Sequence, residues 1–208
     1  ESLGALVAVV GPSLTEISMK HGLGKFFKRP FWESLRDSVV PARRLRSLVL
    51  RGDWTVANES DVEPLGQLAG SLEELELRCV SGGLRRFPES FCALQKLWRL
   101  KLRGHSGITA IPAGISSLKE LEELKLSRCE LSSLPRELGD LSGLTRLEIS
   151  FNPELGTTLP SAEAFPAELG KMKSLRELDL RGCGLGTVPA FVCELKSLES
   201  LTLCQNVL

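Results

Sequence analysis

Catalysis by a nucleophile or a general base requires His, Cys or carboxylate side chains that converge, and the chain has only two histidines, His21 and His105. The stretch Gly104-His105-Ser106-Gly107 lacks the Gly-x-Ser-x-Gly spacing of a nucleophile elbow. Gly24-Lys25 is followed by Phe26 instead of the Ser or Thr of a phosphate-binding loop. The sequence therefore predicts no catalytic residues and no enzymatic activity.

The cysteines could carry a second kind of chemistry, but their spacing indicates no metal site. No Cys-x-x-Cys pair occurs, so we expect neither zinc nor any other cofactor. Cys129 and Cys183 hold equivalent places in a repeated pattern, which favours buried free thiols over disulfides and hence the cytoplasm. Secretion is the alternative, and the single glycosylation triplet Asn58-Glu59-Ser60 would be its marker. The six cysteines are Cys79, Cys92, Cys129, Cys183, Cys193 and Cys204.

The charge balance and hydropathy of the chain limit the classes of partner that we expect it to bind. Its 26 basic and 26 acidic residues give a formal net charge of zero. Non-specific binding to nucleic acid would require an excess of basic residues, so no nucleic-acid partner is expected. The longest apolar run, Leu6-Val7-Ala8-Val9-Val10, is far shorter than the ~20 residues of a membrane helix. We therefore expect no membrane insertion.

The elements that position the side chains come from an internal repeat. The pattern Leu-x-x-Leu-x-Leu recurs at spacings of 27, 25, 24, 23, 31 and 23 residues, and its first leucines are Leu45, Leu72, Leu97, Leu121, Leu144, Leu175 and Leu198. The alternation of leucine with polar residues predicts a short strand in each unit. A single coil cannot bury its own leucines, so the coils must stack and cover one another.

Each unit also has a second half that begins at a proline. An apolar residue stands three positions after each proline, and that spacing predicts a short helix or 3₁₀ turn. The proline suits its start because its φ is fixed and its missing N–H is not needed there. The pairs are Phe87-Pro88, Ile111-Pro112, Leu134-Pro135, Phe165-Pro166 and Val188-Pro189. Parallel strands at ~4.8 Å per coil would then line a concave face on the order of 30 Å across.

The ninth position of each unit should point inward and bind backbone groups of the adjoining turns. That column reads Asp53, His105, Cys129, Asn152, Cys183 and Asn206, with Cys79 or Val80 in the irregular second unit. The units resemble the Leu-x-x-Leu-x-Leu-x-x-(Asn/Cys)-x-Leu-x-x-Leu-Pro form of the leucine-rich repeat. They look most like the roughly 23-residue intracellular class found in Ras-binding repeat proteins, Roco GTPases and immune-type proteins. The resemblance covers residues 45–208. It implies an α/β solenoid with a curved parallel sheet on the concave face and short helices or 3₁₀ turns on the convex face.

Two segments depart from this pattern. Residues 1–44 are predicted to be an N-terminal flanking segment that caps the first coil, with a helix starting at Ser13 and Glu16 as its capping partner. Its aromatic residues, among them Phe31 and Trp32, could instead form a basic-aromatic patch with nearby Lys and Arg. Residues 45–208 then form a solenoid of about seven repeats, which we expect to continue past Leu208. The 31-residue unit carries an insertion at 155–166, interpreted as a loop on the convex side or as a specificity loop.

The outward strand positions form three columns across the predicted sheet. The first column is Ser47, Glu74, Arg99, Glu123, Arg146, Glu177 and Ser200; the second is Val49, Glu76, Lys101, Lys125, Glu148, Asp179 and Thr202; the third is Arg51, Arg78, Arg103, Ser127, Ser150, Arg181 and Cys204. Charges of both signs lie side by side, so many could pair with lateral neighbours. Trp98 and Phe151 interrupt the charged surface, and aromatic residues beside arginine are typical of interface hot spots.

We therefore expect a protein-protein interaction module that binds a partner on its concave face, within a larger signalling or immune-type protein. The alternatives are the regulatory arm of a Roco-type GTPase or immune receptor, and a secreted pattern-recognition protein. The expected contact residues are Arg78, Trp98, Lys101, Arg103, Lys125, Arg128, Glu148, Phe151 and Arg181.

Overall fold

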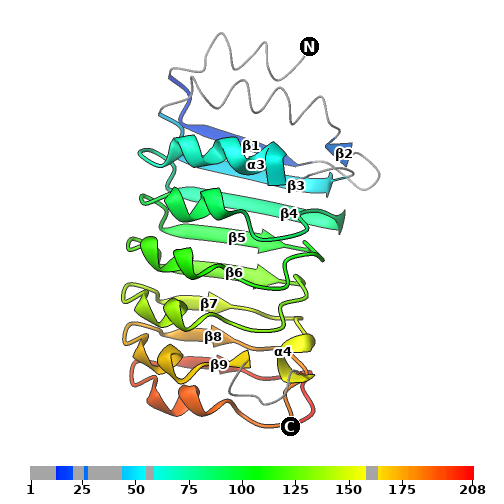
Figure 1. The fold of residues 1–208 in the computed structure, drawn as a ribbon, viewed down its shortest axis with the longest axis vertical. Coiled ribbons are helices and arrows are strands. Elements are labelled where there is room, and N and C mark those ends of the chain that lie inside the picture. The colour runs from blue at the N-terminus through cyan, green and yellow to red at the C-terminus, as the bar shows by residue number, and fades with distance from the viewer. Residues whose placement is uncertain (1–12, 21–25, 28–43, 55–58, 158–163) are drawn as a thin grey trace.

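The computed structural model describes residues 13–20, 26–27, 44–54, 59–157 and 164–208. Their strands form one open parallel sheet in the order β1-β3-β4-β5-β6-β7-β8-β9, and β2 pairs with β3 beside β1 (Figure 1). The strands are β1 (Glu16–Lys20), β2 (Phe26–Phe27), β3 (Ser47–Trp54), β4 (Glu74–Gly82), β5 (Arg99–Arg103), β6 (Glu123–Ser127), β7 (Arg146–Glu148), β8 (Glu177–Asp179) and β9 (Ser200–Thr202). The sheet does not curl into a barrel, and the predicted fold class, a leucine-rich-repeat solenoid, is confirmed.

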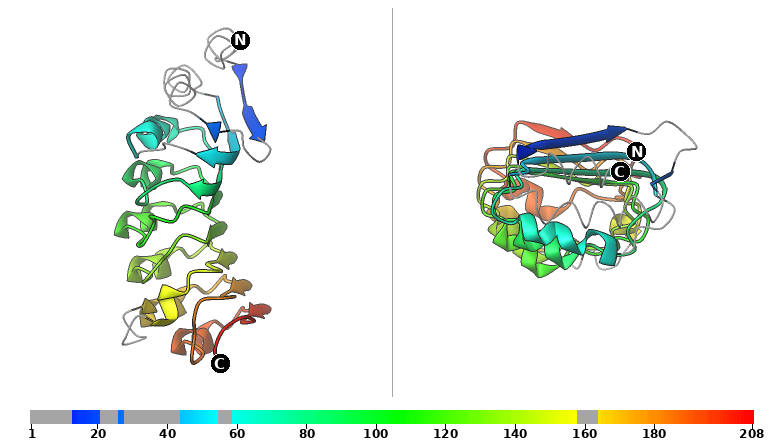
Figure 2. Two further views of the ribbon diagram at one scale, coloured as in Figure 1. Left: turned by 90° about the vertical axis from the view of Figure 1, so that its right-hand side faces the viewer. Right: turned by 90° about the horizontal axis from the view of Figure 1, so that it is seen from above.

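Short turns run along the other side of the molecule, opposite the sheet (Figure 2). In five of them the carbonyl of the preceding proline accepts the first i to i+3 hydrogen bond, for example from Phe91 N to Pro88 O at 3.1 Å. This explains the proline: it lacks the donor that would go unused, and its carbonyl starts the turn. The helical elements are α3 (Glu59–Val62), η2 (Glu63–Leu68), η3 (Glu89–Ala93), η4 (Ala113–Ser117), η5 (Arg136–Asp140), α4 (Glu154–Thr157), η6 (Ala167–Lys171) and η7 (Ala190–Glu194), where η marks a 3₁₀ helix.

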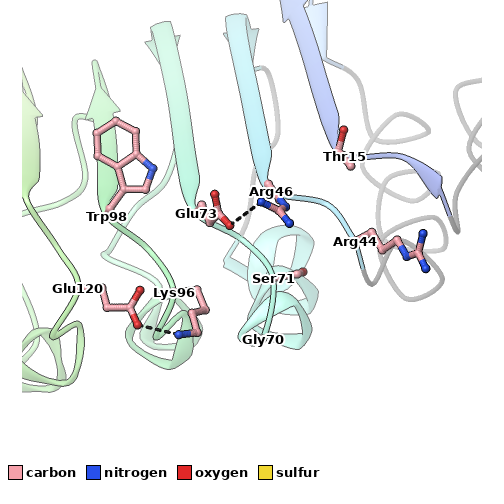
Figure 3. A pocket seen from close by; sticks show the side chains of 9 residues that line it. All are labelled: Thr15, Arg44, Arg46, Gly70, Ser71, Glu73, Lys96, Trp98 and Glu120. Atoms are coloured by element: carbon pink, nitrogen blue, oxygen red, sulfur yellow. Dashed lines mark hydrogen bonds and ion pairs between the residues drawn. The ribbon is translucent and has the colours of Figure 1, made fainter.

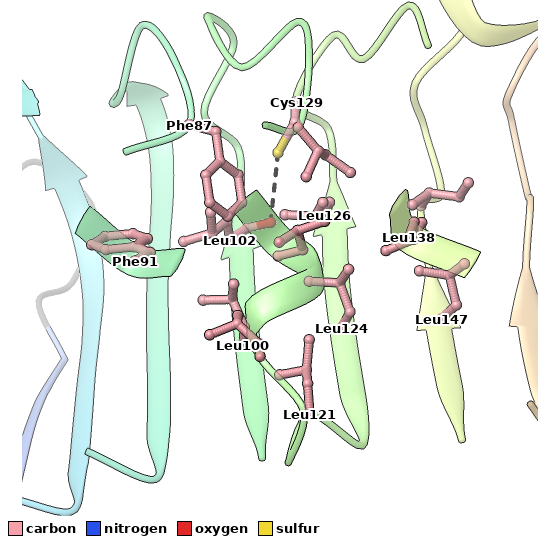
Figure 4. Packing of buried hydrophobic residues seen from close by; sticks show 14 of the residues in the cluster. Phe87, Phe91, Leu100, Leu102, Leu121, Leu124, Leu126, Cys129, Leu138 and Leu147 are labelled. Atoms are coloured by element: carbon pink, nitrogen blue, oxygen red, sulfur yellow. Dashed lines mark hydrogen bonds between the residues drawn. The ribbon is translucent and has the colours of Figure 1, made fainter. Parts of the chain in front are cut away.

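The hydrophobic core lies between the sheet and the turns and runs through all the coils. Leu48, Leu124 and Leu178 are at most 1% exposed, as the repeat predicts for the second leucine of each unit. Leucines and phenylalanines of successive coils interdigitate in this layer (Figure 4). At the last strand Leu201 is 39% exposed, because no following coil covers it in the structure. Coil-on-coil stacking therefore buries the core, as expected for a solenoid.

The helix predicted to start at Ser13 is wrong. Residues Glu16–Lys20 form strand β1, which pairs in parallel with β3 and places Ile17 opposite Leu48. Ile17 is 7% exposed, so burial against the core overrides the weak local preference of a capping sequence. The spacing of Leu14, Ile17 and Met19 is that of the repeat, with Ile and Met in place of Leu.

The cap predicted for residues 1–44 stays a prediction. Most of this segment, including His21, Lys25, Phe31 and Trp32, lies outside the described residues, as do residues 158–163 of the insertion and Asn58, the acceptor residue of the glycosylation triplet. The described part of the insertion begins with α4, in which Leu155 is fully buried. The insertion therefore contributes to the core at its start, and the prediction of a specificity loop remains untested.

Candidate functional site

A ladder of buried side chains, each at the ninth position of its repeat, follows the C-terminal ends of the strands. The Oδ1 atom of Asn152 accepts hydrogen bonds from Cys129 N at 2.9 Å and Leu131 N at 3.1 Å. Its Nδ2 atom donates to Leu126 O at 2.8 Å and Ile149 O at 2.7 Å. One buried amide thus ties its own coil to the preceding one, and Asn206 repeats the same pattern two places further along the ladder.

His105 takes the same ladder position as a neutral imidazole. Leu84 N donates to its Nδ1 at 3.2 Å, so the proton is on Nε2, which donates to Leu77 O at 2.9 Å. Burial lowers the pKa of His105 to about 4, although the bond to Leu77 acts in the opposite direction. A histidine with both ring nitrogens engaged and no charge at neutral pH is structural, not a general base.

The ladder thiols are equally inert. Burial raises the pKa of Cys129 to about 12 and that of Cys183 to about 11, whereas nucleophilic cysteines have a lowered pKa. Their Sγ atoms donate to backbone carbonyls, that of Cys129 to Leu102 O at 3.6 Å (Figure 4). All six cysteines are free, which agrees with the prediction of free thiols, and Cys193 and Cys204 are exposed.

The sheet face, the side of the sheet that points away from the 3₁₀ turns, is covered by ion pairs between strands. Arg99 bridges Glu74 at 3.1 Å and Glu123 at 2.5 Å, while Lys125 bridges Glu123 at 3.3 Å and Glu148 at 3.0 Å. The predicted lateral pairing of the charges is thus confirmed for the first and second columns. Ion pairs that remain open to solvent contribute only ~0–1 kcal/mol each, so a ligand can exchange with the pairs in which Glu123 takes no part.

Glu123 is the centre of this network. Its side chain is only 6% exposed, and Arg99, Lys101 and Lys125 all lie within 4 Å of it. Burial alone would raise the pKa of Glu123, but Lys101, Arg99 and Lys125 together outweigh burial and lower it. The carboxylate is therefore held ionised, and it fixes three cations on the sheet face.

Arg128 and Phe151 occupy an unusual backbone position at the end of the sheet. Their φ angles are 57° and 59°, in the left-handed region, where neighbouring coils have Gly104 and Gly182. A side chain there costs ~1–2 kcal/mol relative to an ordinary conformation. The Arg128 guanidinium lies 4.4 Å from the centroid of the Phe151 ring, and that ring packs over Gly182, where a Cβ would approach Phe151 Cδ1 to 2.9 Å. Non-glycine residues in this conformation are enriched at binding sites.

Trp98 lies at the opposite end of the strands, just before β5. Its ring is half-buried and the Arg99 guanidinium lies 4.2 Å from the ring centroid. It lines an open hollow of about 680 Å³, in which Arg46 pairs with Glu73 at 3.4 Å and Lys96 pairs with Glu120 at 2.7 Å. Figure 3 shows the residues around the hollow, which are Thr15, Arg44, Arg46, Gly70, Ser71, Glu73, Lys96, Trp98 and Glu120.

The structure therefore divides the predicted contact residues into groups. Lys101, Lys125 and Glu148 belong to the ion-pair network, and Arg78, Arg103 and Arg181 stand in the third column. Arg128 and Phe151 form a pair just after the C-terminal ends of their strands. Trp98 lies at the N-terminal end of β5 and is not part of this pair.

Two residues central to the sheet face were missing from the predicted contact set. Arg99 and Glu123 hold the network together, and the alternation of Glu with Arg along the first column was the signal that could have identified them. A second, smaller hollow of about 170 Å³ lies over β6–β9 and is lined by Lys125, Arg146, Glu148, Glu177 and Asp179 among others.

In the described ranges no three His, Cys, Asp or Glu side chains are grouped so that they could hold a metal ion. None of the helices in the part of the chain that the structure describes has the length and apolar character of a membrane span.

Comparison with known sequences places the repeats in a common family. The family model described as "Leucine Rich Repeat" matches residues 120–141 and 174–195. TMV resistance protein N of Nicotiana glutinosa is 34% identical over 162 residues, which are 75% of this chain and 13% of that protein. Toll-like receptor 7 of Drosophila melanogaster is 35% identical over 102 residues, 47% of this chain and 7% of that protein. The chain thus spans a small part of the relatives that it matches.

Solved structures share the fold. A leucine-rich-repeat protein of Leptospira interrogans superposes with a TM-score of 0.69 at 24% identity, over 94% of this chain and 50% of that one. The plant peptide hormone receptor RGFR1 in complex with RGF2 superposes with a TM-score of 0.66 at 19% identity, over 98% of this chain and 34% of that one. At these identities the likeness concerns the fold alone.

Proposed function

Because the chain belongs to the leucine-rich-repeat superfamily, we propose that it binds a partner protein on its sheet face. The observation that carries this proposal is the set of three side-chain columns, which project from the strands without taking part in the hydrophobic core. The family is one of interaction domains, so the expectation that the chain is not an enzyme is confirmed.

The sheet face has the properties of a recognition surface. Its ion pairs away from Glu123 stay partly exposed, so a contact with a partner can replace them at small net cost. Arg128 stacked on Phe151 supplies an aromatic and arginine contact of the kind that dominates binding energies. We place the contact on Arg78, Lys101, Arg103, Lys125, Arg128, Glu148, Phe151 and Arg181, and we keep Trp98 as a separate contact at the far edge.

We further propose that the solenoid is the recognition part of a larger signalling or immune-type protein. The similarity to a plant resistance protein and to a Toll-like receptor supports this role. Free thiols at all six cysteines, two of them exposed, support a reducing compartment such as the cytoplasm. A partner that proved to be a GTPase or another domain of the parent protein would make the chain a regulatory arm instead.

Site-directed photo-crosslinking tests the binding face. A photoreactive residue is placed at Lys125 on the sheet face and, in a matched variant, at Glu137 in η5 on the turn side. We expect saturable crosslinks to a protein partner in cell extract from position 125 only. Crosslinks of equal yield from position 137, or from that position alone, would contradict binding on the sheet face.

A further inference from the structure

The hollow beside Trp98 lies at the N-terminal ends of the strands, apart from the sheet face. Its volume of about 680 Å³ falls within the range of small-molecule sites, ~300–1,000 Å³. Gly70 and Ser71 stand between the longer side chains of Lys96 and Arg44, so the space opens just before β4 (Figure 3). We call it the Trp98 hollow. Its lining comes largely from two rows that flank the first leucine of successive coils: Arg44, Ser71, Lys96 and Glu120 precede that leucine, and Thr15, Arg46, Glu73 and Trp98 follow it.

Side chains of both signs line the Trp98 hollow and pair with one another. Arg46 lies 3.4 Å from Glu73, and Lys96 lies 2.7 Å from Glu120. The four side chains are between 41% and 67% exposed, so a ligand can replace these contacts at small cost. Arg44 adds one cation, and a single excess charge in so open a place is screened by salt. The hollow therefore offers hydrogen-bond donors and acceptors together without selecting for a charged ligand.

Trp98 gives the hollow one rigid aromatic wall. Its ring is half-buried, and the Arg99 guanidinium 4.2 Å from the ring centroid helps to fix its orientation. Within the described residues the indole N–H makes no hydrogen bond, and neither do the hydroxyls of Thr15 and Ser71. An aromatic surface with unused polar groups around it fits a ligand that is apolar on one face and polar at its edges.

The backbone beside the hollow is already used in bonds between coils. Glu73 N donates to Arg46 O at 2.7 Å, Trp98 N donates to Glu73 O at 3.0 Å, and Glu122 N donates to Trp98 O at 2.8 Å. An extended peptide that binds a sheet pairs with backbone groups of this kind, which are not left open here. The side chains must therefore supply the polar contacts to a ligand.

We propose that the Trp98 hollow binds an uncharged saccharide. A sugar ring has an apolar C–H face, which packs on the indole, and hydroxyl groups at its rim, which both donate and accept hydrogen bonds. The carboxylates of Glu73 and Glu120 accept from such hydroxyls. The side chains of Arg46 and Lys96 donate to them. The site is separate from the sheet face, so the inference does not depend on the proposed function.

Binding of oligosaccharides to the intact chain tests the inference. An array of neutral, sulfated and sialylated oligosaccharides is probed with the labelled wild-type chain, and the affinity of each neutral oligosaccharide that binds is measured by saturation-transfer NMR. We expect neutral oligosaccharides to bind with a Kd of about 1 mM or below, with the protons of one ring face closest to the protein. Binding of sulfated or sialylated members alone, or of no member at millimolar concentration, would overturn the proposal.

Matched variants locate the binding. Trp98→Ala should weaken it about tenfold and Glu73→Gln about fivefold, because they remove the stacking surface and one charged acceptor. Glu137→Gln is the control: it removes one carboxylate of an exposed ion pair on the turn side and should leave the affinity unchanged. If circular dichroism shows that Trp98→Ala does not fold, Trp98→Phe takes its place, with an expected loss of about threefold. Equal affinity of the Trp98 variant, Glu73→Gln and the wild type would place the saccharide elsewhere and refute the assignment.

A last measurement distinguishes a free saccharide from one carried by the partner protein. Photo-crosslinking from position 125 is repeated with a saturating amount of the oligosaccharide that binds best. Loss of the crosslink would assign the saccharide to the partner, and an unchanged crosslink would assign it to a free ligand. Because the crosslink is read on the sheet face, failure of saccharide binding leaves the proposed function standing.

Discussion

Acidification should destabilise the solenoid through one buried side chain, His105. In the folded chain burial holds its pKa at about 4, below the value of 6.5 of a free histidine. Between these two pH values the unfolded chain binds a proton that the folded chain does not, so stability falls as the pH falls. The contribution is fully present above pH 6.5 and is lost by about pH 4. Since each pKa unit corresponds to about 1.4 kcal/mol, the loss is about 3 kcal/mol.

The substitution His105→Asn isolates this contribution. Asn152 and Asn206 show that an asparagine at this ladder position binds both neighbouring coils, so the variant should fold without a titrating group. Urea unfolding is followed by circular dichroism at a series of pH values for both proteins. The difference between their free energies of unfolding removes the contributions of other groups, such as the Glu123 carboxyl, whose lowered pKa also makes acid destabilising.

We expect that difference to change by about 3 kcal/mol in favour of the variant between pH 6.5 and about pH 4, with little change above pH 6.5. Parallel stability curves for the two proteins across this range would refute the reasoning, because they would mean that His105 is not held neutral in the fold.

Three other predictions concern the ladder and the sheet face. Asn152→Ala should lower the free energy of unfolding by about 3–5 kcal/mol, because it leaves several buried backbone groups without partners; urea unfolding measures this, and a loss below ~1 kcal/mol would contradict the ladder's role. Phe151→Gly should change stability by less than ~1 kcal/mol, because relief of the left-handed conformation offsets the lost ring contact, yet it should weaken partner binding. A large drop in melting temperature with unchanged binding would show that the ring is structural. Replacing both Trp98 and Arg103 with alanine should reduce partner capture while the melting temperature stays nearly constant, and the opposite pattern would remove both residues from the contact surface.

The spacing of the leucines was enough to predict the strands, the buried positions and the turns after each proline. Stacked coils can bury such a pattern in only one way, which is why Leu48 and Leu124 lie in the core as expected. The ladder was predictable for the same reason, since a small polar residue inside a stack must bind backbone groups. Strand β1 was missed because Ile17 and Met19 replace two of the leucines and because 31 residues separate Leu14 from Leu45, the first leucine of the next unit.

The candidate site was harder to predict, because it depends on backbone angles and side-chain pairing. The residue types of Arg128 and Phe151 do not indicate a left-handed backbone conformation, and the sequence signal for it is the glycine at the equivalent position of other coils, Gly104 and Gly182. The sequence also placed Trp98 together with Phe151, whereas one precedes its strand and the other follows it. Two residues that flank the strand segment in an alignment of the repeats can therefore lie at opposite ends of the strands.

The order of the strands has a mechanical consequence. Strands β1 and β9 stand at the two ends of the long axis, and every strand lies across that axis (Figure 1). A pull along the axis therefore acts along the hydrogen bonds between strands, and because the coil boundaries are in series, each can open by itself while the others stay closed. The molecule should yield coil by coil at low force, like a compliant spring. Force spectroscopy on a chain held at β1 and β9 would show small successive steps, and a single abrupt rupture would rule this behaviour out.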